Sequence, residues 1–177
     1  MTLNLPRLDG TNVYTVTRPI NAGSADIKGF EVNYQQAFTF LPGPLRNLGI
    51  NANYTFSDVD TSNGRPFPNL SRHVYNLVGY YDDGRFDLRA AYNWRSRYAS
   101  VGDGSNGVFA IGIDEFVRAS GQLDLSSSYA LTKNVQLLAE ALNVTNEDFL
   151  RYSGVESRVR DYRVSGRTFI AGVQIKF

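Results

Sequence analysis

The segment Arg85–Tyr98, RFDLRAAYNWRSRY, indicates the fold because its side chains alternate with a period of two. One parity carries apolar residues and a single serine, namely Phe86, Leu88, Ala90, Tyr92, Trp94, Ser96 and Tyr98. The other parity is mostly charged or polar, with Arg85, Asp87, Arg89, Ala91, Asn93, Arg95 and Arg97. Successive side chains of a β-strand point to opposite faces. The segment therefore predicts a strand with one apolar face and one polar face.

Similar alternation recurs along the chain and predicts an all-β fold of about eight strands. The expected strands are 12–19, 25–40, 48–58, 71–81, 85–98, 117–129, 135–145 and 168–177. Segment 71–81 alternates too weakly for its two faces to be assigned. Short turns near 41–47, 82–84 and 131–134 alternate with long loops near 59–69, 99–115 and 146–163. In an antiparallel meander, this arrangement puts the long loops at one end and the short turns at the other.

Composition excludes several classes of function. The 177-residue chain has a formal net charge of +1 and no cysteine, and His73 is its one histidine. We therefore expect no nucleic-acid partner, no cysteine-ligated metal and no multi-histidine metal site. No apolar run approaches the length of a membrane-spanning helix. The first ten residues, MTLNLPRLDG, lack the basic and apolar regions of a signal peptide.

The strands are long for a globular protein. Globular strands are most often about 5–6 residues, whereas a tilted transmembrane strand needs roughly 9–11. Bulky aromatic residues lie near the strand ends, as the interfacial girdles of a membrane barrel require; they are Phe38, Phe40, Tyr92, Trp94, Tyr98, Tyr129 and Phe177. Strand length and loop asymmetry together favour a transmembrane barrel over a soluble β-sandwich.

Four stretches resemble the late barrel strands of TonB-dependent outer-membrane receptors. They are IKGFEVNYQQAFTFLPGPLRNLGINANYTF from Ile27, LSRHVYNLVGYYDDGRFDLRAAYNWRSRY from Leu70, LDLSSSYALTKNVQLLAEALNVTNEDFLRY from Leu123, and GRTFIAGVQIKF from Gly166. The GFE strand, the ALNVTNE segment and the closing GR…F are the more specific parts. The segment FLPGPLRNLGINANYTF also resembles the branch of the family that is linked to carbohydrate-type cargo.

This resemblance implies a Gram-negative outer-membrane protein with a barrel of about 22 strands. It implies a plug in the lumen, a TonB complex that supplies energy, and uptake of a ferric siderophore or an oligosaccharide. We expect residues 1–177 to be the C-terminal portion of such a barrel, without plug or earlier strands. The expected partners are outer-membrane lipid, the rest of the receptor, TonB and the barrel assembly machinery. Neither enzymatic activity nor a cofactor is expected.

Two other classes stay open on the residues alone. A self-contained eight-stranded outer-membrane barrel, with an adhesin or structural role, fits the strand count. A soluble β-sandwich that binds a ligand would show the same alternation, because its polar faces meet water.

The polar parity of segment 85–98 supplies the candidate ligand-facing residues Arg89, Asn93, Arg95 and Arg97, with Tyr98 at its end. In a receptor lumen they could contact the plug, an anion or a sugar through charge-assisted hydrogen bonds. The alternative is a solvated lumen wall in which these cations pair with Glu31, Asp87 or Asp124. The loop aromatics Tyr98, Phe109, Phe149 and Tyr152 could stack on sugar rings or pack the loops together.

Three motifs suggest chemistry but fail on context. The GDGSNG stretch at 102–107 has the spacing of a dinucleotide loop, but no amphipathic helix follows it. The acids of DVDTSNG, Asp58 and Asp60, with Ser62, hint at a calcium loop whose glycine and closing glutamate are misplaced. Ser71 with His73 lacks any mark of an oxyanion hole. We therefore expect no catalytic or metal-binding residues.

The chain closes on TFIAGVQIKF, Thr168–Phe177, whose odd positions are apolar or aromatic. By resemblance, Gly172, Ile175 and Phe177 match the C-terminal signal that the outer-membrane assembly machinery reads. Ile170 departs from the polar residue usual at its position.

Overall fold

The computed structural model describes the backbone of residues 2–9, 12–19, 23–100 and 114–177, and side chains within 23–100 and 114–177. These residues form strands β1–β13 and one short 3-10 turn, η1 (Gly43–Asn47). No described helix is long and apolar enough to cross a membrane.

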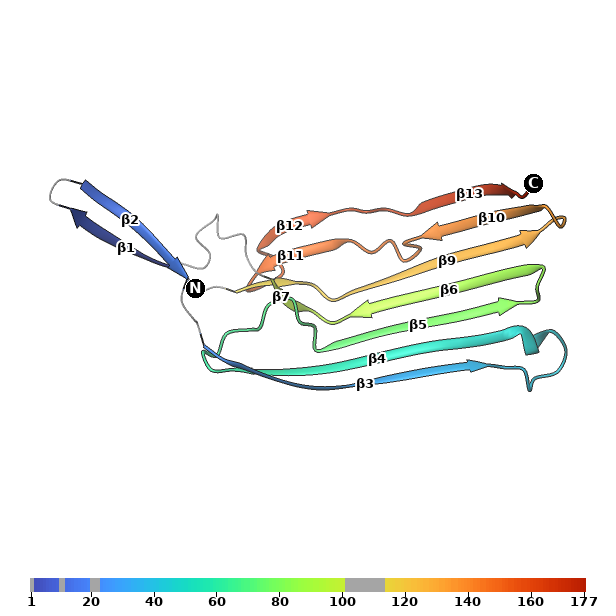
Figure 1. Cartoon of the computed structure of the whole chain (residues 1–177), viewed down its shortest axis with the longest axis horizontal. Helices are drawn as coiled ribbons and strands as arrows, with labels where there is room; N and C mark the ends of the chain where they lie inside the picture. Colours follow the sequence, from blue (N-terminus) through green and yellow to red (C-terminus); the bar gives the residue numbers. More distant parts are fainter. Residues whose placement is uncertain (1, 10–11, 20–22, 101–113) are drawn as a thin grey trace.

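Seven long strands pair in one antiparallel sheet, which we call the wall (Figure 1). Its strands are β3 (Ala25–Ala37), β4 (Leu48–Thr61), β5 (His73–Asp82), β6 (Phe86–Arg95), β9 (Ser120–Ala130), β10 (Val135–Leu142) and β13 (Thr168–Ile175). Each pairs with the wall strand that comes next along the chain. The predicted all-β antiparallel meander is thereby confirmed. Among the described residues the sheet is open, with β3 and β13 at its edges.

The first predicted strand differs from expectation in its partner. Strand β2 (Asn12–Pro19) is present, but it pairs with β1 (Thr2–Asp9) in a separate two-stranded hairpin. The sequence carries an Asp9–Gly10 hairpin signal at the end of β1. Closing such a short connection costs little chain entropy, so the local partner is favoured over a distant wall strand.

Two of the predicted long loops contain strands of their own. The short strands β7 (Tyr98–Ser100), β8 (Glu115–Val117), β11 (Phe149–Ser153) and β12 (Val159–Arg163) pair in the order β12-β11-β8-β7. We call them the outer sheet. Figure 1 shows the outer sheet at the left end of the wall strands, with β7, β11 and β12 stacked in the same bottom-to-top order as the wall. The long hairpins therefore extend the wall beyond short irregular breaks.

The pairing register gives each face of the wall a uniform character. Val32, Tyr54, Tyr75 and Trp94 are opposite one another on β3, β4, β5 and β6. Directly paired residues of antiparallel strands share a face. Tyr75 and Leu77 of β5 therefore stand on the apolar face, and Asn76 on the polar face. This assigns the facing of segment 71–81, which its own sequence leaves open.

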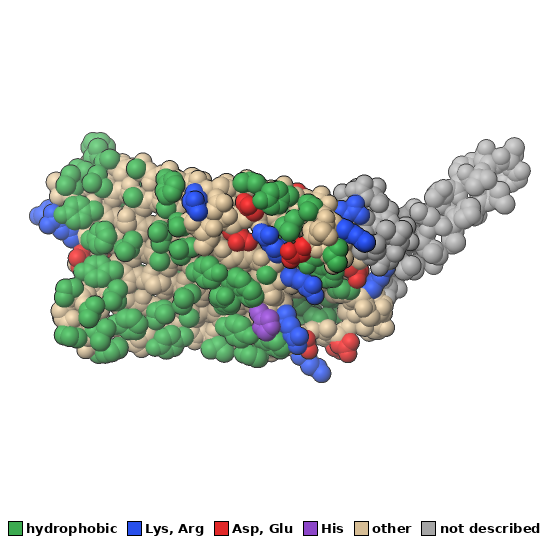
Figure 2. All heavy atoms as spheres, turned by 180° about the vertical axis from the view of Figure 1, so that it is seen from behind, with side chains coloured by type: hydrophobic (Ala, Val, Ile, Leu, Met, Phe, Trp, Pro, Cys, Tyr) green, Lys and Arg blue, Asp and Glu red, His purple; other side chains and the backbone are tan. Residues whose placement is uncertain are grey.

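The apolar face of the wall has no protein layer packed on it in the described structure. Large side chains there are solvent-exposed, including Phe30 at 56%, Tyr34 at 54% and Phe169 at 74%. Figure 2 shows hydrophobic side chains spread over this face, with charged side chains gathered toward the end that carries the outer sheet. Within residues 23–100 and 114–177, the buried apolar side chains all belong to the outer sheet; they are Ala99, Val117, Leu150 and Tyr152. The wall therefore has an apolar surface without a core.

Two glycines let aromatic rings lie flat against the wall. A Cβ at Gly49 would collide with the ring of Tyr80, which is its direct cross-strand partner. A Cβ at Gly121 would collide with Tyr92 and Trp94. Gly79, by contrast, has open space where a Cβ would lie. Glycine is thus required at Gly49 and Gly121 by close packing rather than by backbone conformation.

We predict that Gly49→Ala destabilises the wall by roughly 1–3 kcal/mol, because the new methyl group must displace the ring of Tyr80. Urea unfolding of the folded protein measures this. The matched Gly79→Ala variant should stay within about 0.5 kcal/mol of the parent. Adding Tyr80→Ala should remove most of the difference that Gly49→Ala causes. Equal destabilisation by both alanine variants would contradict the packing explanation.

A pair of carboxylates holds the tight turn between β5 and β6. Asp83 Oδ1 accepts the backbone N–H groups of Phe86 at 2.7 Å and Arg85 at 2.9 Å. These bonds favour the ionised carboxylate and hold the pKa of Asp83 below its ordinary value of 3.8. Asp82 Oδ1 accepts the N–H of Gly84, whose φ is +84°. The sequence DDG is therefore read correctly as a hairpin turn.

The lowered pKa of Asp83 predicts a pH-dependent contribution to stability. A carboxyl group with a depressed folded-state pKa stabilises fully above its unfolded pKa, and this contribution disappears as pH falls through the lower folded value. We expect the stability difference between the parent and Asp83→Asn to be constant above about pH 5 and to shrink below about pH 4. Urea midpoints measured from pH 6 to pH 3 test this. A difference independent of pH would refute the carboxylate's role.

Candidate functional site on the polar face of the wall

Five adjacent strands each place a side-chain amide at the same level of the polar face. The paired positions run in the order Asn33, Asn53, Asn76, Asn93 and Gln122 on β3, β4, β5, β6 and β9. We call them the amide row. Neighbouring strands lie about 4.8 Å apart, so the row spans four strand intervals, about 19 Å. It presents donors and acceptors in a regular line across the wall.

Hydrogen bonds join the β3–β4 end of the amide row. Asn53 Nδ2 donates to Asn33 Oδ1 and to Glu31 Oε1, both at 2.6 Å. Asn76 Nδ2 donates to Asn53 Oδ1 at 3.4 Å. At the other end, Gln122 Nε2 donates to Asp124 Oδ1 at 2.8 Å. Glu31 and Asp124 therefore flank the row as acceptors and orient its amides.

A shallow hollow of about 270 Å³ lies along the row over β3, β4 and β5. Asn51 also lines it, and the Oδ1 atom of Asn51 is buried without a hydrogen-bond donor. An acceptor in that state has unused capacity for a hydrogen bond, and supplying a donor removes an energetic cost. The hollow thus offers several amides to a ligand that carries hydroxyl or amide groups.

The predicted ligand-facing residues do not all lie together. Arg89 and Asn93 are exposed on the polar face, where Asn93 belongs to the amide row. Arg89 is two positions before Ala91 on β6. It pairs directly with Tyr80 on β5 and with Ser126 on β9. The side chains of Arg89 and Asn93 are thus exposed to the space that the polar face borders.

Arg95 is occupied in holding the β4–β5 loop. Its Nε donates to Ser71 Oγ at 2.9 Å, and its NH2 group donates to the carbonyl oxygen of Asn69 at 3.4 Å. Its guanidinium also lies 3.8 Å from the ring centroid of Tyr98. Ser71 in turn donates to the carbonyl oxygen of Ser96 at 2.8 Å. Arg95 and Tyr98 thus contact each other, and together they connect the β4–β5 loop to the irregular segment between β6 and β7.

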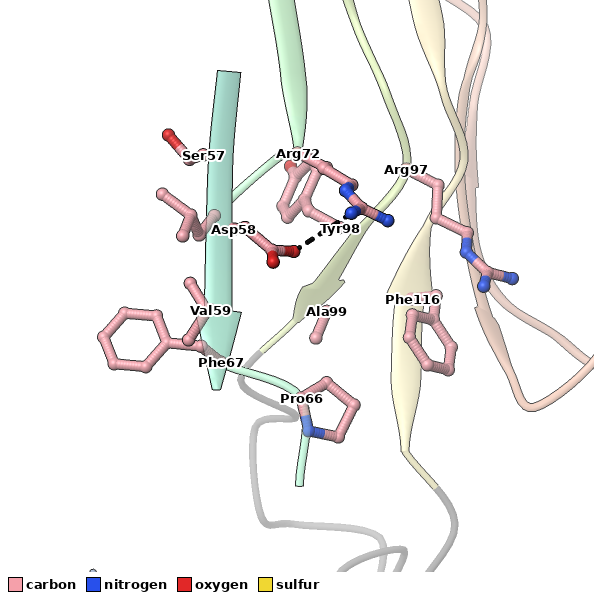
Figure 3. Close-up of a pocket in the computed structure, with 11 residues that line it drawn as sticks. Ser57, Asp58, Val59, Pro66, Phe67, Arg72, Arg97, Tyr98, Ala99 and Phe116 are labelled. Atoms are coloured by element: carbon pink, nitrogen blue, oxygen red, sulfur yellow. Dashed lines mark ion pairs between the residues drawn. The ribbon is translucent and has the colours of Figure 1, made fainter. Parts of the chain in front are cut away.

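Arg97 lies in a separate hollow beside the outer sheet. It is about 210 Å³ in volume, and its lining includes Asp58, Arg72, Arg97, Tyr98 and Phe116 (Figure 3). We call it the arginine pocket. The Arg97 guanidinium lies 5.0 Å from the centroid of Phe116, and Arg72 forms an ion pair with Asp58 at 3.2 Å. Figure 3 shows Arg72 beside Asp58 and Arg97 above Phe116, with Ala99 lower in the pocket.

The arginine pocket continues the apolar face rather than the polar one. Arg72 lies 5.4 Å from the ring centroid of Phe56, which pairs with Phe30 and His73 on the apolar face. The chain bends at Arg72 and is irregular at Ser96–Arg97, so the period of two does not hold through these points. Arg97 therefore does not continue the line of Arg89 and Asn93.

The loop aromatics that the structure describes lie against other side chains. Tyr152 is only 3% exposed and packs on Phe116, with the two ring centroids 6.0 Å apart. Phe149 is covered by Arg163 at 4.9 Å. Phe109 and the GDGSNG motif lie outside the described residues. Among the described residues, no group of three or more potential ligands could hold a metal ion.

Ser71 and His73 have different partners from each other. Ser71 bonds to Arg95 and Ser96, as described above, whereas the Nδ1 atom of His73 lies 2.8 Å from the hydroxyl of Tyr54. Asp58 and Ser62 are likewise occupied, by Arg72 and by the backbone N–H of Ser24 respectively.

The three residues of the expected assembly signal lie at the edge of the wall. Gly172 pairs with Leu138 and Ile175 pairs with Val135, both on β10. Phe177 follows the end of β13 and is fully exposed. All three are thus accessible along one edge strand.

Sequence reasoning missed most of the amide row and all of its continuity. Except for Asn76, whose segment has no assigned faces, its members stand on the predicted polar parity of their strands, so four of the five strands each carried the signal separately. The register between strands, which brings them to one level, could not be deduced from single segments.

Comparison with known proteins supports these observations. The family described as "TonB dependent receptor-like, beta-barrel" matches residues 3–144. Among solved structures, the chain is similar to the siderophore receptor PiuA from Acinetobacter baumannii, with a TM-score of 0.63 and 19% sequence identity. The similarity covers 98% of this chain and 24% of that receptor, so the chain spans about a quarter of the receptor's length. No curated protein sequence matches. The two-faced wall, its meander order and the family match lead to one conclusion: the chain belongs to the TonB-dependent receptor-like β-barrel family.

Proposed function

We propose that residues 1–177 are the C-terminal portion of the barrel of an outer-membrane receptor that imports a scarce nutrient with energy supplied through TonB. The observation that carries the proposal is the wall itself. It has an exposed apolar face suited to lipid and an opposite face lined with amides and charges. A chain with this pattern is stable only when lipid covers one side and a polar interior fills the other.

The edges of the wall support the larger assembly. Strands β3 and β13 each have one neighbour among the described residues, and unpaired backbone groups at such edges are not tolerated in lipid. Further barrel strands would pair with both edges, and a plug would occupy the polar side. Gly172, Ile175 and Phe177 would present the closing strand to the assembly machinery. The proposal accordingly assigns the protein to the outer membrane of a Gram-negative cell.

The alternatives from the sequence are less well supported. In an eight-stranded barrel the wall would close on itself, whereas the described sheet has seven strands and two free edges. A sandwich would need a second sheet packed on the apolar face, but the outer sheet extends the wall end to end (Figure 1).

Two cargo classes remain in the proposal. A ferric siderophore is the first, in keeping with the family and with the fold shared with a siderophore receptor. An oligosaccharide is the second, favoured by the amide row, because neutral amides pair well with hydroxyl groups. In either case the reaction is binding and transport without covalent chemistry.

We predict that Leu77→Arg on the apolar face prevents stable insertion of the full-length protein into bilayers. An arginine facing lipid costs roughly 2–4 kcal/mol near the bilayer midplane. The neighbouring Asn76→Arg, on the polar face, is the matched control and should insert normally. Flotation with lipid vesicles measures both variants. Normal insertion of Leu77→Arg, or failure of both variants, would count against the proposed orientation.

We further predict that replacing Asn76 and Asn93 together with leucine lowers cargo uptake by at least about tenfold. A site built to hydrogen-bond its ligand loses the affinity when those groups are removed. Uptake of radioactive ferric siderophores and labelled oligosaccharides by cells that express the full-length receptor measures the effect and identifies the cargo class. Ser126→Ala, also on the polar face but outside the lining of the hollow, should leave uptake unchanged. Full uptake by the double variant would exclude the amide row from cargo binding.

A further inference from the structure

The arginine pocket lies where the apolar face of the wall ends. Phe30, Phe56 and His73 form the last paired aromatic level of that face on β3, β4 and β5. Asp58 follows two positions further along β4, and Arg72 lies over the ring of Phe56. Charged side chains in Figure 2 gather just beyond the hydrophobic area, on the same face. The pocket is therefore at the rim of the surface that we assign to lipid.

The pocket carries more positive than negative charge. Asp58 is ion-paired with Arg72, and Lys28 stands opposite Asp58 in the strand register. In the part of the chain that the structure describes, no carboxylate lies within ion-pair distance of Arg97. Its guanidinium rests on the ring of Phe116, which holds the cation in place without neutralising it. The guanidinium of Arg97 is thus available to an anion, whereas that of Arg72 is shared with Asp58.

We propose that the arginine pocket binds the phosphomonoester headgroup of a membrane lipid. Guanidinium groups bind phosphate oxygens in pairs, and the two arginines reach over the same hollow (Figure 3). The acyl chains of that lipid would lie along the apolar face below, against the aromatic level of Phe30 and Phe56. A phosphate-binding pocket at the end of an apolar surface suits a lipid headgroup. A cargo molecule would instead bind on the polar side of the wall.

This inference rests on the proposed membrane orientation of the wall. It is nevertheless separate from cargo uptake, because the arginine pocket and the amide row occupy opposite faces. Variants of one can therefore be compared with variants of the other in the same protein.

The test uses the full-length protein in nanodiscs of phosphatidylcholine that contain a small fraction of fluorescent phosphatidic acid. Arg97→Gln and Arg72→Gln should each weaken the selective retention of phosphatidic acid about tenfold, as the loss of one charge-assisted hydrogen bond implies. Asp58→Asn should strengthen retention, because it removes a competing anion and frees Arg72. Arg89→Gln removes an arginine from the opposite face and should change nothing.

Opposite effects of Arg97→Gln and Asp58→Asn cannot arise from misfolding alone. Equal retention by the parent and Arg97→Gln would overturn the inference. Displacement of the lipid by millimolar inorganic phosphate would overturn the lipid assignment and indicate a site for soluble anions. If the protein failed to enter nanodiscs at all, the membrane orientation in the proposed function would fail as well. Normal insertion with no lipid selectivity would refute the pocket alone.

Discussion

The register of backbone hydrogen bonds between the seven wall strands is the constraint on which the rest of the structure depends. Asn53 and Tyr54 are consecutive in the chain, yet one joins a row of amides and the other a row of aromatic rings. A slip of one residue between two strands would send a whole set of side chains to the wrong face. The wall has no core of its own, so this pairing must hold without support from a second layer.

The breaks in the period of two are as informative as the period. At Arg72 and at Ser96–Arg97 the backbone becomes irregular, and the residues that follow change sides. Arg95 uses this break to bond Ser71 and Asn69 and to cover Tyr98. Arg97, two positions later, is released to the other side, where it meets Phe116. A single irregularity therefore separates a cation that holds the structure together from one that is free to bind.

Much of the wall was predictable because each strand encodes its own faces. The alternation of Phe86–Arg95 and the DDG turn before it identify a strand and its connection without reference to any other segment. The features that the sequence did not predict depend on which segments pair with each other. The outer sheet is built from strands as short as Tyr98–Ser100, which have too few residues to show a period. Asn12–Pro19 shows a period, but its pairing with Thr2–Asp9 depends on competition between a near and a distant neighbour. Predicting the amide row would have required the register of five strands at once. Predicting the side on which Arg97 lies would have required knowledge of the irregular backbone at Ser96–Arg97.

The outer sheet differs from the wall in what keeps it folded. Glu115 of β8 is nearly buried between Arg151 of β11 and Arg160 of β12, at 3.5 and 3.6 Å. Val117 and Leu150 are buried beside this network. One chain thus combines a wall whose apolar face has no protein cover among the described residues with an outer sheet that carries its own small core. Sequence changes in the outer sheet need only preserve that core, so under the proposed orientation the segments outside the membrane can diversify while the wall stays the same.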